Sequence, residues 1–189
     1  MKVSVVIPAY NEEKYIGKCL ESTVQQTQKP DEVIVVDNNC TDKTVEVAQK
    51  FGARIVKEEK QGMISSRNAG FDAARYEIIG RIDADTILPN DWVLKVKENF
   101  KNPNIVAISG PIYIKNKKFY FASIILFRFL SFLVKHNVLL GANIALRKSA
   151  WEKIKKDICL EDKKVHEDID LAIHISKEGE IKFDQALIV

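Results

Sequence analysis

The first half of the chain alternates short apolar runs with segments whose apolar residues recur at helical spacing. The runs are rich in β-branched residues, and the segments follow the order strand 3–7, helix 15–24, strand 31–37, helix 45–51, strand 53–56, helix 62–74 and strand 78–82. Continuous apolar runs are typical of strands buried on both faces, and their alternation with helices is typical of a parallel sheet. We therefore predict an α/β fold with a mostly parallel central sheet and helices on both faces.

The second half of the chain follows the same pattern less regularly. Spacing predicts, in order, helix 91–100, strand 105–114, an apolar segment 119–134, strand 141–148, helix 151–154 and helix 166–175. A chain of 189 residues is long enough for one domain with a substantial core and too short for two comfortable ones. We therefore expect a single domain.

Polar side chains follow three of the predicted strands. Pro8, Ala9 and Tyr10 follow the first strand, Asp37 ends the second, and 83–85 follows the strand 78–82. Because the carboxyl ends of parallel strands lie along one edge of a sheet, where ligands bind, we expect these groups to share one site.

Asp83 and Asp85 are separated by one small residue, Ala84. In an extended chain residues i and i+2 point the same way, so the two carboxylates can converge. Two like charges that close repel each other unless a cation lies between them or one is protonated. Mg²⁺ or Mn²⁺ suits such oxygen ligands, whereas an Asp-rich turn after a strand is the plain alternative. The convergence with the other two groups favours the metal.

Several classes of function are disfavoured. No G-x-x-x-x-G-K-[ST] or G-x-G-x-x-G motif follows the first strand, and the three histidines have no zinc-binding spacing. A net charge of +3 without a basic, aromatic-interleaved stripe gives no reason to expect a nucleic-acid partner. Three cysteines far apart indicate free thiols in a reducing compartment. The first apolar run is shorter than the core of a signal peptide.

The apolar segment 119–134 has two interpretations. It is shorter than the about 20 residues that span a bilayer, Arg128 interrupts it, and lysines flank it. A helix resting on an anionic membrane surface fits this composition. A helix buried in the core or in a homodimer interface fits it equally well, and the sequence leaves the choice open.

Acidic residues begin the predicted helix after His166. Glu167 and Asp168 stand in its first turn, where the helix dipole favours negative charge. On spacing alone, this helix-start chemistry is the better explanation of both residues.

Six motifs in order now make the chain resemble the inverting glycosyltransferases of family 2, which have the GT-A fold. The similarity runs from Val3 to about Phe183 and rests on Val5–Glu13, Ile34–Asn38, Gln61–Gly62 leading to Ser66–Gly70, Asp83–Asp85, Gly141–Asn143 and Glu167–Asp168. Each motif alone is weak, but six in the family's order form a specific signal.

The resemblance implies a role for each matching residue. In such an enzyme the nucleotide pocket is lined by Pro8, Ala9, Tyr10 and Glu12, with Asp37 on the base (uracil or guanine) and Arg67 near the nucleotide. Asp83 contacts the ribose or the metal, and Asp85 ligates Mg²⁺ or Mn²⁺ on the diphosphate. Gly141, Ala142, Asn143 and Glu167 shape the donor-sugar and acceptor region, and Asp168 is the general base.

The resemblance also implies a division of labour and a set of partners. Residues 1–100 form the half that binds the nucleotide-sugar donor, a UDP- or GDP-sugar, and residues 101–189 form the acceptor half. The acceptor is a sugar hydroxyl or a polyprenyl phosphate, and we expect the protein in the cytoplasm, at the membrane face if 119–134 binds lipid. Many relatives continue beyond the equivalent of Val189, so we expect either a minimal form or a piece of a longer protein.

Two other functions compete with this expectation. A sugar-nucleotide nucleotidyltransferase would share the nucleotide and metal chemistry, although its Gly-rich phosphate loop is absent from the N-terminus. A non-catalytic nucleotide-sugar-binding module is the third reading, and it applies if catalysis needs residues beyond Val189.

Overall fold

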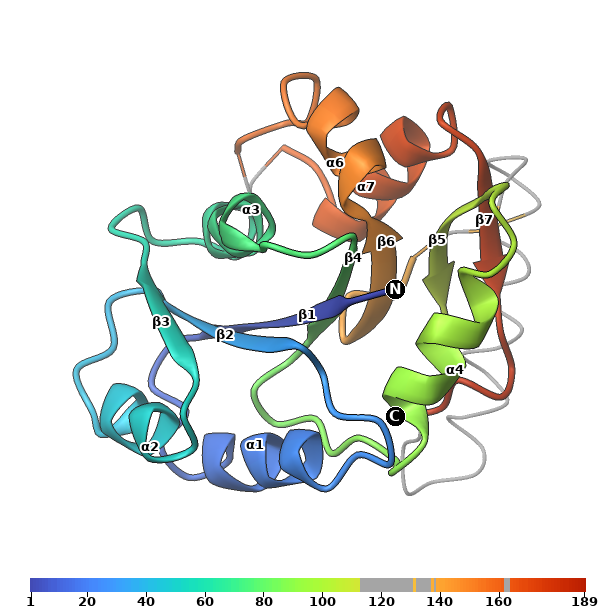
Figure 1. Cartoon of the computed structure of the whole chain (residues 1–189). Coiled ribbons are helices and arrows are strands. Elements are labelled where there is room, and N and C mark those ends of the chain that lie inside the picture. The colour runs from blue at the N-terminus through green and yellow to red at the C-terminus, as the bar shows by residue number, and fades with distance from the viewer. Residues whose placement is uncertain (113–130, 132–136, 138, 162–163) are drawn as a thin grey trace, which may run out of the picture.

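The computed structural model describes residues 1–112, 131, 137, 139–161 and 164–189, which form a central sheet covered by helices on both faces (Figure 1). In this part of the chain the sheet has seven strands in the order β3-β2-β1-β4-β6-β5-β7. Their bounds are Val3–Ala9 (β1), Glu32–Asp37 (β2), Arg54–Lys57 (β3), Ile78–Ile82 (β4), Ile105–Ser109 (β5), Asn143–Arg147 (β6) and Glu180–Phe183 (β7). The predicted α/β class is confirmed.

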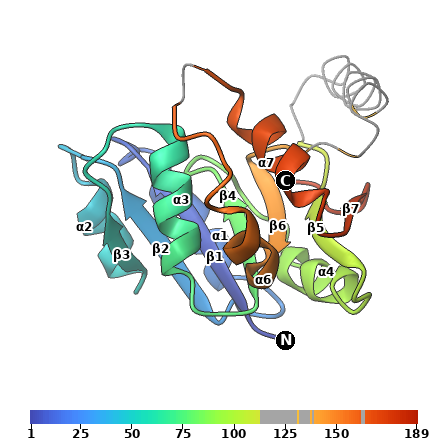
Figure 2. The same cartoon turned by 90° about the horizontal axis from the view of Figure 1, so that it is seen from above.

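The helices divide between the two faces of the sheet, as Figures 1 and 2 show. Their bounds are Ile16–Val24 (α1), Thr44–Lys50 (α2), Met63–Ala73 (α3), Trp92–Asn99 (α4), Lys148–Ile154 (α6) and Glu167–Ile175 (α7). One buried cluster joins the sheet to α1, α2 and α4, and a second joins its other face to α3, α6 and α7. Alternate residues of β1 serve the two clusters, since Val5 and Ile7 belong to the first and Val6 to the second.

Strand β6 runs antiparallel to both of its neighbours, whereas the other four strand pairs of the described sheet are parallel. β1 pairs in parallel with β2 and β4, β2 with β3, and β5 with β7, but β6 is antiparallel to both β4 and β5. Consequently Asn143, which begins β6, pairs with Ile82, which ends β4. This reversal brings the residues before β6 to the edge of the sheet where Asp83 and Asp85 lie.

Strand β5 is shorter than the predicted strand 105–114. It ends at Ser109, whose carbonyl accepts a hydrogen bond from the Asp184 amide. The carbonyl of Pro111 then accepts one from the Val189 amide, and a Cβ on Gly110 would overlap the Leu187 carbonyl. The C-terminal residues therefore lie against the chain just after Ser109, a tertiary contact that local spacing does not reveal.

Two further predictions have different outcomes. Cys19, Cys40 and Cys159 are free thiols, as expected. The segment 119–134 lies outside the described residues except for Ser131, so its contacts stay a prediction. Within the described part of the chain, no helix combines the length and the apolar character that crossing a membrane requires.

A pair of helical glycines tests how closely α3 packs on the sheet. A Cβ on Gly70 would overlap the side chain of Val6 and lie 2.9 Å from Val36, whereas one on Gly17 of α1 would meet Val47 at an ordinary 3.7 Å. We expect Gly70→Ala to lower the free energy of unfolding by about 1–3 kcal/mol through overpacking. Gly17→Ala should leave it unchanged or raise it by up to about 1 kcal/mol, because alanine is the better helix former. Urea denaturation of both variants checks the contrast, and equal effects would contradict it.

Candidate active site at the carboxyl edge of the sheet

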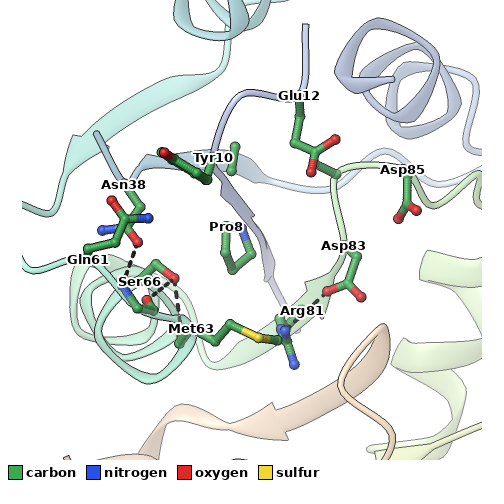
Figure 3. A pocket seen from close by; sticks show the side chains of 13 residues that line it. Pro8, Tyr10, Glu12, Asn38, Gln61, Met63, Ser66, Arg81, Asp83 and Asp85 are labelled. Atoms are coloured by element: carbon green, nitrogen blue, oxygen red, sulfur yellow. Dashed lines mark hydrogen bonds and ion pairs between the residues drawn. The ribbon is translucent and has the colours of Figure 1, made fainter. Parts of the chain in front are cut away.

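A pocket of about 380 Å³ lies where β1, β2 and β4 end (Figure 3). Its walls come from four segments far apart in the sequence: Pro8, Ala9, Tyr10 and Glu12; Asn38; Gln61, Gly62, Met63 and Ser66; and Arg81, Asp83, Ala84 and Asp85. The prediction that polar groups after the first and fourth strands meet at one edge therefore matches the geometry. Asp37 is the exception, since the next residue, Asn38, lines the pocket in its place.

The loop after β1 is tied by hydrogen bonds to the turn before α2 and to the first residue of α2. Asn11 has a positive φ of 56°, and its side-chain oxygen accepts the Thr41 amide at 2.8 Å. The Glu12 amide donates to Thr44 Oγ1 at 2.7 Å. These contacts leave Tyr10 exposed at the mouth and carry Glu12 into the pocket wall (Figure 3).

Asn38 clamps the opposite wall. Its side-chain nitrogen donates to the carbonyls of Glu58 and Lys60, at 2.9 and 2.8 Å, and its oxygen accepts the Gly62 amide at 2.9 Å. Asp37 instead turns its Oδ1 to the Cys40 amide, 2.8 Å away. Asn38 thus ties the segment leading into α3 to the end of β2 and makes it one side of the pocket.

Three carboxylates, those of Glu12, Asp83 and Asp85, lie at one end of the pocket (Figure 3). Burial, with the charges of Asp85, Asp42 and Asp83, raises the pKa of Glu12. Burial also raises the pKa of Asp83; Arg81 opposes this, and Asp85 and Glu167 add to it. Such mutual repulsion is relieved by a bound cation or by a proton, so this end of the pocket attracts positive charge.

Cys19, which lies next to the Asp83 turn, is a neutral thiol. Cys19 on α1 donates its S–H toward the Asp83 carbonyl, 3.5 Å away. Burial raises its pKa to about 12, with Asp85 and Asp83 adding to the effect. It therefore stays a neutral thiol that supports the backbone of the Asp83 turn.

Behind the pocket lies a buried charged cluster that includes Arg81. The Arg81 side chain is 3% exposed, and its Nη2 lies 3.1 Å from Asp83 Oδ1. Its Nη1 lies 3.0 Å from Glu167 Oε1 and 3.3 Å from Asp168 Oδ1. Asp168 Oδ2 accepts the Gly141 amide at 2.9 Å. The side chain of Arg81 thus connects Glu167 and Asp168 to Asp83.

Arg67 lies in the same cluster and is not among the residues that line the pocket. It is fully buried, its Nη1 donates to the Glu167 carbonyl at 2.9 Å, and its Nε and Nη2 donate to Asn68 Oδ1. Burial lowers its pKa, opposed by the charge of Glu167. Its observed contacts hold the start of α7 on α3.

The 141–143 motif divides its side chains between two environments. Gly141 faces Asp168, and Ala142 is half-buried. Asn143 is fully buried: its Oδ1 accepts the Trp92 indole N–H at 2.9 Å, and its Nδ2 donates to the Leu187 carbonyl at 2.5 Å. Its observed contacts anchor α4 and the C-terminal segment.

The roles of Asn38 and Arg81 were missed from the sequence. Asn38 was only part of a recognised motif, and nothing in the chain indicates that its amide binds three backbone groups. Arg81 did carry a signal, because it is a charge inside the apolar run 78–82. A fully buried arginine requires partners, so that position called for a search for buried acids.

Solved structures define the class of this fold. The chain superposes on the mannosyltransferase PcManGT from Pyrobaculum calidifontis, in complex with GDP-Man and Mn²⁺, with a TM-score of 0.77 and 20% identity, over 99% of this chain and 55% of that one. It superposes on S. aureus TarS in complex with UDP-GlcNAc with a TM-score of 0.71 and 21% identity, over 98% and 56%. The fold is therefore that of the GT-A glycosyltransferases.

The family model of "Glycosyl transferase family 2" matches residues 4–154. The chain belongs to glycosyl transferase family 2, as its motifs predicted. Glycosyltransferase AglE of Haloferax volcanii is 30% identical over 118 residues, which are 58% of this chain and 39% of AglE. The matched region is thus well under half the length of that relative. Glu167 and Asp168 lie beyond the matched residues.

Proposed function

We propose that this chain is the catalytic core of an inverting glycosyltransferase that uses a nucleoside diphosphate sugar and a divalent ion. The observation that carries the proposal is the meeting of three carboxylates in one pocket wall with the Glu167–Asp168 pair directly behind Asp83. Residues 1–100 would bind the donor, and residues 101–189 would supply the acceptor side.

The residues present fit a hard divalent ion. Asp83 is partly exposed, Asp85 is exposed, and both face a pocket large enough for a diphosphate. In the described part of the chain, no three candidate ligands converge on one point. That arrangement suits Mg²⁺ or Mn²⁺, which is often held by one or two carboxylates with substrate phosphates and water. When bound, the ion would act as a Lewis acid that stabilises the departing diphosphate.

The protein's own groups would bind and orient the substrates. Pro8, Ala9, Tyr10 and Glu12 would contact the nucleotide, and Asp37 would turn to the base in the bound state. Asp168 would take the proton of the acceptor hydroxyl as that oxygen attacks the anomeric carbon from the face opposite the diphosphate. A single displacement of this kind inverts the anomeric centre.

Donor and acceptor are proposed as classes. PcManGT is solved with GDP-Man and Mn²⁺ and TarS with UDP-GlcNAc, so both GDP- and UDP-sugars are candidates for this chain. For the acceptor we propose a sugar hydroxyl, with a polyprenyl phosphate as the alternative. Contact with the cytoplasmic membrane face and a homodimer stay predictions tied to residues 119–134.

Thermal unfolding with a panel of nucleoside diphosphates, each with and without Mn²⁺, tests the donor site. One nucleotide at 100 times its Kd should raise the Tm by roughly 5–10 °C in the presence of Mn²⁺. Asp85→Ala should abolish this shift. Asp91→Ala, which removes an exposed carboxylate paired with Lys95, should retain it. A shift that survives Asp85→Ala, or that needs no Mn²⁺, would contradict the proposed site.

Product analysis then separates the enzyme classes. Release of the free nucleoside diphosphate marks sugar transfer, whereas release of pyrophosphate marks nucleotidyl transfer. Binding of donor and Mn²⁺ without turnover on any acceptor would leave the non-catalytic binding module.

A further inference from the structure

A buried arginine next to the last residue of β4 is the most unusual feature of the sheet. All five residues of β4 are buried, and Arg81 pairs with Val6 on one side and Ile144 on the other. Burying a guanidinium is costly unless several carboxylates or carbonyls compensate it. An apolar residue would fill this strand position without that cost, so the charge calls for an explanation.

The two terminal nitrogens of Arg81 connect opposite sides of the site. Nη2 contacts Asp83, next to the donor pocket, while Nη1 contacts Glu167 and Asp168 at the start of α7. Asp83 follows β4 directly, but Asp168 is 87 residues beyond Arg81 in the chain. A planar guanidinium fixes the orientation of the carboxylates that it contacts as well as balancing their charge, whereas a lysine ammonium only balances the charge.

Gly141 leaves just enough room for this arrangement. A Cβ at this position would overlap Arg81 Nη1 and lie 2.7 and 2.8 Å from the two carboxylate oxygens of Asp168. Its amide also donates to Asp168 Oδ2. The absence of a side chain at 141 therefore allows Arg81 and Asp168 to approach each other.

We propose that Arg81 is a positioning residue that fixes the carboxylate of Asp168 relative to that of Asp83. The inference rests on the proposed function, because it assigns Asp83 to the donor side and Asp168 to the acceptor side. Reaction between two bound substrates depends on their alignment, and a displacement of about 1 Å can cost about 100-fold in rate. A single rigid guanidinium bound to both carboxylates sets that alignment.

A plain counter-charge is the competing role, and it predicts different results. If Arg81 only balances buried acids, a lysine should restore activity along with stability. Removing the cation should also strengthen the binding of Mn²⁺, because a positive charge next to Asp83 disappears. If Arg81 orients Asp83, its removal should weaken Mn²⁺ binding instead.

The experiment compares Arg81→Lys and Arg81→Met with Arg147→Lys and Arg147→Met. Arg147 is a matched control on the neighbouring strand: it binds the carbonyls of Ile105, Phe100 and Asn102 and pairs with Ile78, at the far end of β4. For each variant we would measure the Tm, kcat and KM for the donor. Calorimetric titration would give the affinity for Mn²⁺ with UDP or GDP, whichever stabilises the wild type.

We expect Arg81→Lys to match Arg147→Lys in Tm but to lose at least about tenfold in kcat, the lower limit for one lost charge-assisted hydrogen bond. Arg81→Met should bind Mn²⁺ with the nucleotide at least about tenfold more weakly than the wild type, because Asp83 loses the charged contact with Nη2 that orients it. Arg81→Lys with the kcat of Arg147→Lys, or tighter Mn²⁺ binding in Arg81→Met, would overturn the proposal.

Gly141→Ala keeps the test decisive if Arg81→Met does not fold. Its Cβ would overlap Nη1 and crowd both oxygens of Asp168, so the two groups should move apart and kcat should fall at least about tenfold. Wild-type kcat in Gly141→Ala would count against Arg81 as the positioning residue. A wild type that binds no nucleotide with Mn²⁺ and transfers no sugar would instead refute the proposed function itself.

Discussion

Asp168→Asn is expected to lower kcat by about 10²–10⁴-fold, the usual contribution of a general base. The amide has nearly the shape of the carboxylate, so its oxygen can still accept the Gly141 amide, but it cannot take a proton. Single-turnover transfer to a sugar hydroxyl acceptor measures the effect. The Mn²⁺-dependent thermal shift with nucleotide should stay as in the wild type, because Asp168 is not among the residues that line the proposed donor pocket.

Asp170→Asn is the matched control for this prediction. Asp170 stands on the same helix and is about as buried, but its carboxylate accepts the Cys159 amide at 3.1 Å and lies 3.6 Å from His174 Nδ1. It should retain wild-type kcat. If Asp168→Asn retains kcat as well, the base assignment is wrong, or the acceptor is already ionised, as a polyprenyl phosphate would be. Comparing a sugar acceptor with a phosphate acceptor separates these two cases.

Trp92→Ala is expected to lower the free energy of unfolding by about 3–5 kcal/mol, the range for removing a fully buried aromatic side chain. Its ring fills the space above Gly80, where a Cβ would come within 2.6 Å of it. Its indole N–H binds Asn143 Oδ1 at 2.9 Å, so truncation also leaves a buried acceptor unpaired. Urea denaturation measures the loss.

Ile87→Ala provides the comparison, because Ile87 is 60% exposed and should change stability by no more than about 0.5 kcal/mol. Trp92→Phe should fall between the two, since it keeps most of the packing and loses the hydrogen bond. A loss below about 1 kcal/mol in Trp92→Ala would contradict the view that this residue joins α4, β4 and β6.

The order of elements from β1 to β4 could be predicted from the sequence because it depends on local patterns. A buried strand such as β1 is a continuous apolar run, and a helix such as α1 repeats its apolar residues every three or four positions. Those signals need no knowledge of the rest of the chain. The early end of β5 was not readable, because the C-terminal residues that pack beside Gly110 are distant in sequence.

The candidate site could likewise be predicted from the sequence only in part. Asp83 and Asp85 reach the pocket with Tyr10 and Glu12 because parallel strands share one carboxyl edge. Arg67 lies in the buried cluster with Glu167, and its expected place near the nucleotide stays a prediction. The expected roles of Ala142 and Asn143 stay untested, and the observed contacts of Asn143 are with Trp92 and Leu187.

The sequence by itself therefore determined the α/β class, the family and the polar groups that follow the strands, since each depends on residue type and near-neighbour spacing. Only the tertiary structure decided that β6 runs antiparallel beside β4, that Asn38 lines the pocket, and that Arg81 joins Asp83 to Asp168. These contacts link residues far apart in the chain, and their strength depends on burial and on angstrom-scale geometry that no local pattern encodes.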